Sequence, residues 1–231
     1  MARPRNTPSF TPTLEREREL HSLGYARVCG VDEAGRGPLA GPVVAGAVIL
    51  PPNFAPENWS SLNDSKQLSA STREELFARI TSTFEYGIGI VSAQVIDEIN
   101  IRQASWRAMQ IAVEDLKTHS ATRAQKQQVL DAPDYVLIDG LGYGPGPWPY
   151  EAIIKGDAKS FSIAAASIVA KQTRDALMIE LDKEYSGYGF AKHKGYGTNQ
   201  HLQALQQMGP CAIHRRTFAP VKLIAHPQAA R

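Results

Sequence analysis

The chain has 231 residues, 43% of them hydrophobic, and its 25 Lys and Arg residues nearly balance 23 Asp and Glu residues, leaving a formal net charge of +2. This composition fits one large domain with a real core, and it means that any site for a polyanion must come from local clusters of basic residues. No apolar run reaches about 18 residues and the polar, Pro-rich start lacks the apolar core of a secretory signal, so we expect a cytoplasmic protein without a membrane span.

The first 22 residues are polar and rich in proline. They predict a flexible N-terminal arm, with a short charged helix from Leu14 to Leu20. From residue 23 to residue 224 the pattern is that of one globular domain, and residues 225–231 form a short tail.

Five short apolar runs predict five β-strands, at residues 25–31, 43–50, 84–91, 135–138 and 150–154. The first two strands are joined by a glycine-rich connection that is short enough for antiparallel pairing. Three strands in series, followed by alternating strands and helices, predict an α/β domain with a mixed sheet flanked by helices.

The helices between and after these strands have recognisable signals. Ser71 to Glu74 reads as a capping box that begins a helix ending near Ile80. Residues 95–100 and then 101–117 have helical periodicity, and they fit either two short helices or one kinked helix. Residues 162–185 form the longest helix, and a further helix over 198–208 ends at Gly209 and Pro210, which begins a small C-terminal helical part.

Two adjacent carboxylates, Asp32 and Glu33, end the first apolar run and lead into Gly35-Arg36-Gly37. Glycines allow backbone N–H groups to approach a ligand closely, and an arginine between them can form bidentate contacts to phosphate. Because successive strand residues point to opposite faces, both acids can serve one site only if the chain leaves regular pleating there. The alternative is a salt-bridged turn in which Arg36 neutralises one of the acids.

Asp139 and Asp157 also follow predicted strands. Ligands of open α/β sheets collect at strand ends, so the four acids can converge on one site. At ~5 Å and an effective dielectric of about 20, each carboxylate pair would repel by about 3 kcal/mol. Two divalent cations would balance four such charges, and oxygen ligands suit Mg²⁺ or Mn²⁺ better than zinc. The chemistry that follows is two-metal phosphodiester hydrolysis.

Each acid also has a purely structural interpretation. Asp139 before Gly140 is a common turn pair, and Asp157 is well placed to favour the start of the long helix. Asp175 lies inside that helix and is expected to form a local ion pair rather than to bind metal.

Several basic residues are candidates for contacts with phosphate groups. They are Lys66, Lys171, Arg174, Lys192, Lys194, Arg215 and Arg216. His193, His201, Cys211 and His214 offer zinc ligands, but their irregular spacing makes zinc the weaker interpretation. The two cysteines, Cys29 and Cys211, lie too far apart in sequence to indicate a disulfide framework.

The order of these motifs resembles the bacterial ribonuclease HII family from about Val28 to Lys222. The segments that carry the resemblance are GVDEAGRGPLAGPVVAGAVIL from residue 30, NDSK at 63–66, IDG at 138–140, KGD at 155–157, SIAAASIVAK at 162–171, HKGYGT at 193–198 and HRRTF at 214–218. The resemblance implies a ribonuclease H-like fold and a metal-dependent endoribonuclease that cuts RNA in RNA/DNA hybrids and nicks 5′ of ribonucleotides embedded in duplex DNA, a step of ribonucleotide excision repair.

The resemblance also implies roles for individual residues. Asp32, Glu33, Asp139 and Asp157 form the catalytic metal-binding set, with Mg²⁺ or Mn²⁺ as cofactor. Gly35, Arg36 and Gly37 contact the ribonucleotide where its 2′-hydroxyl is sensed, and Tyr196 stacks under the sugar of the following deoxynucleotide. Lys66 and Lys171 complete the substrate contacts. The expected products carry 3′-hydroxyl and 5′-phosphate ends, and the protein is expected to act as a monomer.

Two alternatives differ from this interpretation. A ribonuclease HIII would carry an extra N-terminal binding domain and a Glu in place of Asp157, and the arm is too short for such a domain. A catalytically silent hybrid-binding module would bind without metal-dependent nicking, which is hard to reconcile with four acids in the expected positions.

Overall fold

A mixed five-stranded β-sheet forms the centre of the structure, a computed structural model that describes residues 11–59, 61–62, 68–116, 132–142 and 146–225. The strands are β1 (Val28–Ala34), β2 (Val43–Ile49), β3 (Glu85–Val91), β4 (Tyr135–Asp139) and β5 (Tyr150–Ile153). Their order across the sheet is β3-β2-β1-β4-β5, with β1, β2 and β3 antiparallel and β1, β4 and β5 parallel. The predicted fold class, an α/β domain with a mixed sheet, is confirmed.

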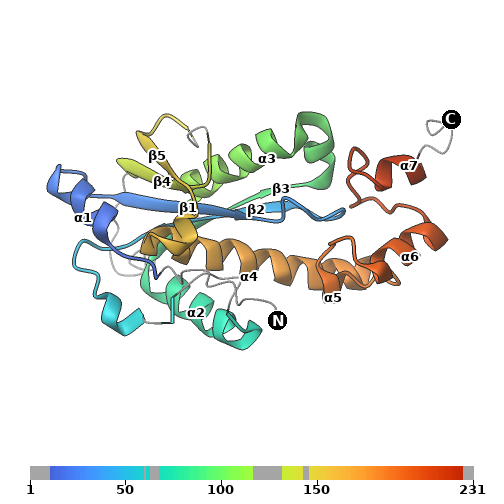
Figure 1. The fold of residues 1–231 in the computed structure, drawn as a ribbon, viewed down its shortest axis with the longest axis horizontal. Helices are drawn as coiled ribbons and strands as arrows, with labels where there is room; N and C mark the ends of the chain where they lie inside the picture. Colours follow the sequence, from blue (N-terminus) through green and yellow to red (C-terminus); the bar gives the residue numbers. More distant parts are fainter. Residues whose placement is uncertain (1–10, 60, 63–67, 117–131, 143–145, 226–231) are drawn as a thin grey trace, which may run out of the picture.

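Helices cover both faces of this sheet (Figure 1). On one face lies α3 (Ala93–Asp115), and its apolar residues form a core with buried side chains of β1, β2 and β4. On the other face α4 (Phe161–Glu184) lies along the sheet, with α2 (Ala70–Thr83) packed outside it. The longest helix is therefore in direct contact with the central strands.

The sheet and its helices approach closely because glycines stand at the contacts. A Cβ at Gly46 would lie 2.4 Å from the carbonyl oxygen of Ala166 in α4, and a Cβ at Gly89 would lie 1.8 Å from that of Ala108 in α3. Real Cβ atoms do not come so near to backbone oxygens, so a side chain at either position would push a helix away from the sheet.

Two details of the helices correct or refine the sequence expectations. The N-cap of α2 is Ser69, whose hydroxyl accepts a hydrogen bond from Thr72 N at 3.1 Å, and not Ser71. Within α3, Asn100 has a positive φ of 66°, and its side-chain oxygen accepts from Arg102 N and Gln103 N. Asn100 thus separates two helical segments and caps the second, as the interpretation of two short helices predicts.

Three short helices form the C-terminal part at one end of the sheet (Figure 1). They are α5 (Phe190–His193), α6 (Asn199–Met208) and α7 (Val221–Ala225). The last residues of α4 pack against this part through Met178, which shares an apolar cluster with Phe190 and Ala204.

The N-terminal segment packs on the domain, which corrects part of the arm prediction. Helix α1 (Glu15–Ser22) buries Glu17 and Leu20, and Leu20 lies in a cluster with Val28, Leu137 and Ile163. Residues 13–22 are therefore not a flexible arm. The prediction failed because the buried face of α1 includes a charged residue, which the sequence pattern assigns to solvent.

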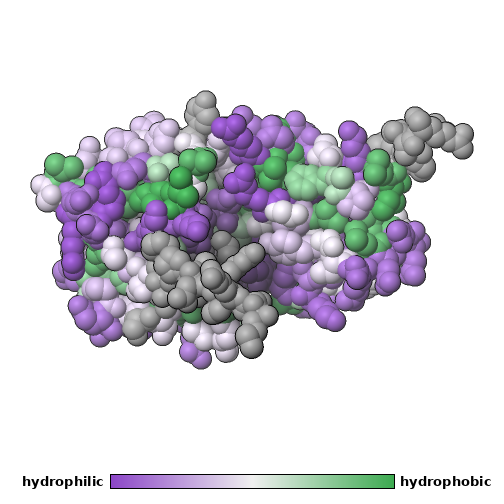
Figure 2. Space-filling view, in the orientation of Figure 1, coloured by the Kyte–Doolittle hydropathy of each residue, from purple (hydrophilic) through white to green (hydrophobic). Residues whose placement is uncertain are grey.

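The surface is predominantly hydrophilic on the face shown in Figure 2, where hydrophobic residues form separate patches. No helix in the described ranges is long and apolar enough to span a membrane.

We predict that Gly89→Ala destabilises the protein by about 1–3 kcal/mol, the usual cost of overpacking a core contact. The reason is the clash of the new methyl group with the α3 backbone. Chemical denaturation measures the change, and Gly142→Ala is the control because a Cβ there meets only Trp106 at 3.6 Å. Equal stabilities of the two variants would contradict the account of the sheet-to-helix contact.

Candidate active site

Parallel pairing of β1 with β4 brings the first three acids together. Val31 pairs with Ile138 in the register of the two strands, so the residues that follow, Asp32 and Asp139, are neighbours at the end of the paired region. Glu33 lies one residue further along β1. The convergence of acids at strand ends is thus a direct result of this pairing.

The chain does not leave regular pleating at the two adjacent acids, contrary to the sequence expectation. β1 continues to Ala34, paired antiparallel with Val44 of β2. Asp32 therefore faces α4, where it has a hydrogen bond with Ser167, and Glu33 faces α3, where it lines a hollow with Ser105. Both carboxylates still reach one pocket because β4 ends at Asp139 and leaves the edge of β1 uncovered there.

The fourth acid, Asp157, lies in a short 3₁₀ turn, η3 (Gly156–Ala158), between β5 and α4. It is buried and close enough to Asp32 to raise the pKa of that residue. The preceding Gly156 N donates a 2.6 Å hydrogen bond to Asp139 Oδ1, which ties this turn to the end of β4. The N-cap of α4 is Ser160, so Asp157 does not have the capping role that local sequence allows.

A pocket of about 260 Å³ contains three of the four acids and most of the predicted substrate-binding residues. Its lining consists of Asp32, Glu33, Ala34, Gly35, Arg36, Gly37, Asp139, Ser167, Lys171, Arg174 and Tyr196. A larger hollow of about 400 Å³ beside α1 contains none of these residues. The smaller pocket is therefore the candidate active site.

Carboxylates in this pocket destabilise one another's charged forms. Burial, followed by the charges of Glu33 and Asp139, raises the pKa of Asp32 well above its ordinary value. Burial also raises the pKa of Glu33, which Arg36 lowers and Asp139 raises. The protein thus supplies less positive charge than this group of acids requires, and a bound cation would relieve the difference.

The donor set fits a hard divalent cation because all of the ligands are carboxylate oxygens. Among the residues that the structure describes, no three Asp, Glu, His or Cys side chains already form a group that could hold a metal ion. The acids are neighbours around one pocket, and their side chains must turn toward a bound ion.

In the loop after β1, Arg36 forms the salt bridge of one interpretation and also lines the pocket, as the phosphate-contact interpretation requires. Arg36 Nη1 lies 3.2 Å from Glu33 Oε1, so the predicted salt bridge exists. The arginine is nevertheless exposed, and it lines the pocket between two glycines. Gly35 has a φ of +96°, and a Cβ there would lie 2.0 Å from Arg174 Nε, so only glycine fits this turn.

The sequence suggested Arg174 and Arg215 as contacts for phosphate groups. In the structure both side chains are instead buried and support the loop after β1. They are 1% and 0% exposed. Arg174 donates to the carbonyls of Pro42, Ala40 and Lys194, and Arg215 donates to those of Gly35, Arg36, Gly41 and Pro42. Burial lowers the pKa of Arg215 to about 9. The two guanidinium groups fix the loop after β1 and tie it to the segment before Tyr196.

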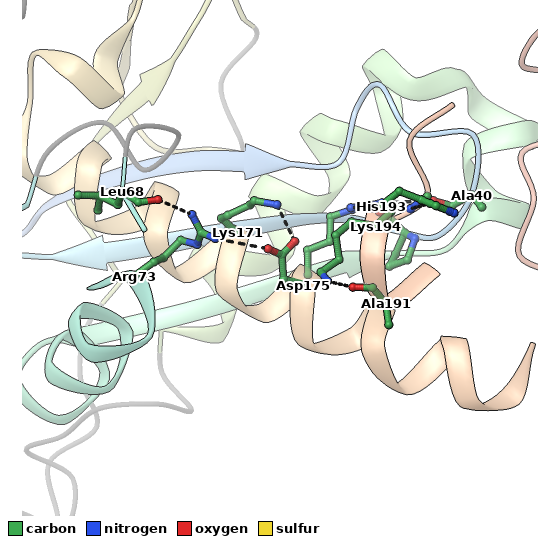
Figure 3. Close-up of polar contacts among 11 residues, drawn as sticks. Ala40, Leu68, Arg73, Lys171, Asp175, Ala191, His193 and Lys194 are labelled. Carbon is green, nitrogen blue, oxygen red and sulfur yellow. Dashed lines mark hydrogen bonds and ion pairs between the residues drawn. The ribbon is translucent and has the colours of Figure 1, made fainter. Parts of the chain in front are cut away.

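Lys171 of α4 is part of the lining of the pocket, and Figure 3 shows its side chain directed toward Asp175. Its ammonium group lies 2.6 Å from Asp175 Oδ1, and Arg73 approaches Asp175 Oδ2 at 3.8 Å. Burial lowers the pKa of Lys171 and the bond to Asp175 raises it. Asp175 forms a local ion pair, as predicted. Lys66 lies outside the described residues.

Tyr196 is exposed at the rim of the pocket, beside Gly37. A chain of hydrogen bonds holds its backbone: His201 Nδ1 lies 2.9 Å from Tyr196 O, and His201 Nε2 lies 3.0 Å from His214 Nε2. Burial and His201 lower the pKa of His214 to about 4, so it is neutral at neutral pH. These ring nitrogens bond to one another and to the backbone, which leaves the zinc interpretation without support.

Sequence reasoning missed two serines in the walls of the site. Ser167 bonds to Asp32, and Ser105 is buried beside Glu33. Ser167 follows the buried alanines at the start of α4, and nothing in that run of small residues distinguishes the serine that bonds to an acid.

Comparisons with known proteins agree with one another. A family model described as Ribonuclease HII matches residues 29–221. A ribonuclease HII of Chlamydia muridarum is 51% identical over 208 residues, covering 89% of this chain and 88% of the relative, and one of Syntrophotalea carbinolica is 46% identical over 207 residues, covering 89% and 91%. The crystal structure of ribonuclease H2 from Pyrococcus horikoshii superposes with a TM-score of 0.67 at 26% identity, covering 89% of this chain and 100% of that one.

We predict that Asp32→Asn raises the melting temperature of the protein in EDTA at pH 8. The substitution removes a charge that burial and neighbouring carboxylates disfavour, and each kcal/mol gained corresponds to about 2–4 °C in a chain of this size. Because the folded-state pKa of Asp32 is raised, the gain should diminish as pH falls and the wild-type carboxyl becomes protonated.

The control is Asp134→Asn, whose carboxylate accepts hydrogen bonds from Ala26 N and Arg27 N and which should lower the melting temperature. Differential scanning fluorimetry between pH 5 and pH 8 measures both. A destabilised Asp32→Asn protein at pH 8 would contradict the description of the pocket as electrostatically strained.

Proposed function

The chain belongs to the ribonuclease HII family, and on that premise we propose that it nicks duplex DNA on the 5′ side of embedded ribonucleotides as well as cutting the RNA strand of hybrids. Family membership makes it a metal-dependent endoribonuclease that acts on RNA paired with DNA. The finer proposal concerns the embedded ribonucleotide, the number of metal ions and the residues responsible.

One observation carries the proposal: a single pocket contains Asp32, Glu33 and Asp139 together with the Gly35-Arg36-Gly37 loop and Tyr196. The acids provide a place for phosphodiester hydrolysis, and the loop and the tyrosine provide contacts for a sugar. Reaction and substrate choice are thus served by adjacent side chains.

The metal set consists of Asp32, Glu33, Asp139 and Asp157, and it would hold two divalent ions, Mg²⁺ or Mn²⁺. Ions in such sites activate the attacking water and stabilise charge on the leaving oxygen, giving 3′-hydroxyl and 5′-phosphate ends. The chain's own contribution is to place the carboxylates. Ser167 orients Asp32, Gly156 N holds Asp139 at 2.6 Å, and Arg36 restrains Glu33.

Recognition of the ribonucleotide depends on its 2′-hydroxyl, the group that distinguishes it from a deoxynucleotide irrespective of the base. The backbone of Gly35 to Gly37 can approach that hydroxyl because both glycines line the pocket and carry no side chain of their own. Tyr196 offers a flat surface to the sugar of the next nucleotide, where a second 2′-hydroxyl would not fit. This arrangement favours a ribonucleotide followed by DNA.

Lys171 would bind a backbone phosphate at the pocket rim, an interaction that adds affinity without base preference. Lys66 has the same proposed role. We further propose that the protein acts as a monomer in the cytoplasm on nucleic acid.

The test is a duplex that contains one ribonucleotide, incubated with protein and Mn²⁺ or Mg²⁺. We expect a single nick 5′ of the ribonucleotide, and Asp139→Asn should abolish nicking while largely retaining duplex binding. An all-DNA duplex is the substrate control. A labelled strand resolved at single-nucleotide resolution gives the position of the cut.

An intact ribonucleotide-containing strand would contradict the proposal. Binding of that duplex without metal-dependent nicking would instead favour the catalytically silent binding module.

A further inference from the structure

A side chain of the N-terminal helix α1 forms hydrogen bonds with the beginning of α4, immediately after the turn that carries Asp157. This contact is polar and buried, which is unusual for the attachment of a terminal segment. It joins residues that lie more than 140 positions apart in the sequence.

Glu17 is the centre of the contact. It is 3% exposed, and its Oε1 accepts three hydrogen bonds, from Ser160 Oγ at 2.6 Å, Ser162 Oγ at 2.8 Å and Ser162 N at 3.0 Å. A carboxylate at this position also interacts favourably with the N-terminal end of the α4 dipole. Its other oxygen, Oε2, is buried and has no hydrogen-bond partner among the residues that the structure describes. The position therefore costs desolvation free energy that a simple apolar contact would avoid.

Thr13 provides a second attachment on the same segment. Its N–H donates to Lys159 O at 2.9 Å, and its carbonyl accepts from Phe161 N at 3.2 Å. Together Thr13 and Glu17 form hydrogen bonds with each of the four residues from 159 to 162. The N-terminal segment, which is not part of the β-sheet, thus fixes the position of the start of α4.

The turn that carries Asp157 is closed onto this held segment. Ser160 N donates to Gly156 O at 2.8 Å, and Lys159 N donates to the same oxygen at 2.9 Å. On its other side Gly156 N donates to Asp139 Oδ1. A displacement of Ser160 would therefore move Gly156 and Asp157, and would disturb the bond that orients Asp139.

We infer that Glu17 is a positioning residue for Asp157, and that residues 13–22 are a structural part of the catalytic centre. The inference rests on the proposed function in one respect, the role of Asp157 as a metal ligand. Glu17 itself does not contact the metal or the substrate. It acts through Ser160 and Ser162 on the geometry of the η3 turn.

The test measures Mn²⁺ affinity by isothermal titration calorimetry, with Mn²⁺ alone as the probe. Glu17→Gln keeps the size of the side chain but removes its charge and one acceptor, and we expect the dissociation constant for Mn²⁺ to rise about tenfold, as is typical when support of a metal ligand is lost. Arg16→Ala is the matched control on the same helix. It removes ion pairs with Glu19 and Glu151 and should leave Mn²⁺ affinity unchanged.

A double-variant cycle separates positioning from general destabilisation. In an Asp157→Asn background, Glu17→Gln should cause a smaller further loss of Mn²⁺ affinity than it causes in the wild-type protein, because Asp157 is already disabled and only the effect on Asp139 through Gly156 remains. Ile96→Val, a core change in α3 on the face of the sheet opposite to α4, controls for a lower melting temperature alone and should not change the affinity.

The outcomes distinguish the inference from the proposed function. If Asp157→Asn leaves Mn²⁺ affinity unchanged, the proposed role of Asp157 is wrong. If Asp157→Asn weakens binding but folded Glu17→Gln does not, or if their effects add, the role of Glu17 is wrong. Should Glu17→Gln fail to fold, Ser162→Ala removes one of the three donors and should weaken Mn²⁺ binding by a smaller factor; an unchanged affinity in that variant would overturn the inference.

Discussion

Parallel pairing between β1 and β4 is the constraint on which the site depends. It places Asp32 beside Asp139, although more than 100 residues of chain separate them. The last pair of the two strands is Val31 with Ile138, so the pocket opens at the two acids that follow. On the other side of β1, antiparallel pairing with β2 continues past this point, so β1 remains a regular strand as far as Ala34. The two acids of β1 therefore approach one pocket from opposite faces of the sheet, at an edge that the shorter β4 leaves open.

Charge in and around this pocket is distributed unevenly. Burial and neighbouring carboxylates raise the pKa values of Asp32 and Glu33, whereas two buried arginines, Arg174 and Arg215, bind backbone carbonyls instead of carboxylates. Their guanidinium groups stabilise the shape of the loop after β1 without neutralising the acids. This division explains how a pocket can retain the unbalanced negative charge that attracts divalent cations and still have a precisely folded wall.

The sequence was sufficient for the mixed sheet, for the antiparallel pairing of its first two strands and for the kink near Asn100, because each depends on local periodicity and turn signals. It was also sufficient to select the acids that the strand pairing brings together. The sequence-based prediction failed where tertiary contacts bury charged residues that are usually exposed to solvent. Glu17, Arg174 and Arg215 are charged and yet buried, and only the segments packed around them explain why. The continuation of β1 through two acids likewise depends on β2, which lies outside the local pattern.

The strand pairing implies that divalent ions bind at the ends of β1 and β4, between carboxylates that the fold brings together. Anomalous scattering from crystals of the protein grown with Mn²⁺ would locate these ions. We expect Mn²⁺ within coordination distance of the Asp32, Glu33 and Asp139 carboxylates, with Asp157 in the same group of ligands. Mn²⁺ bound elsewhere, for example among His193, His201 and His214, with no peak at these acids, would contradict it.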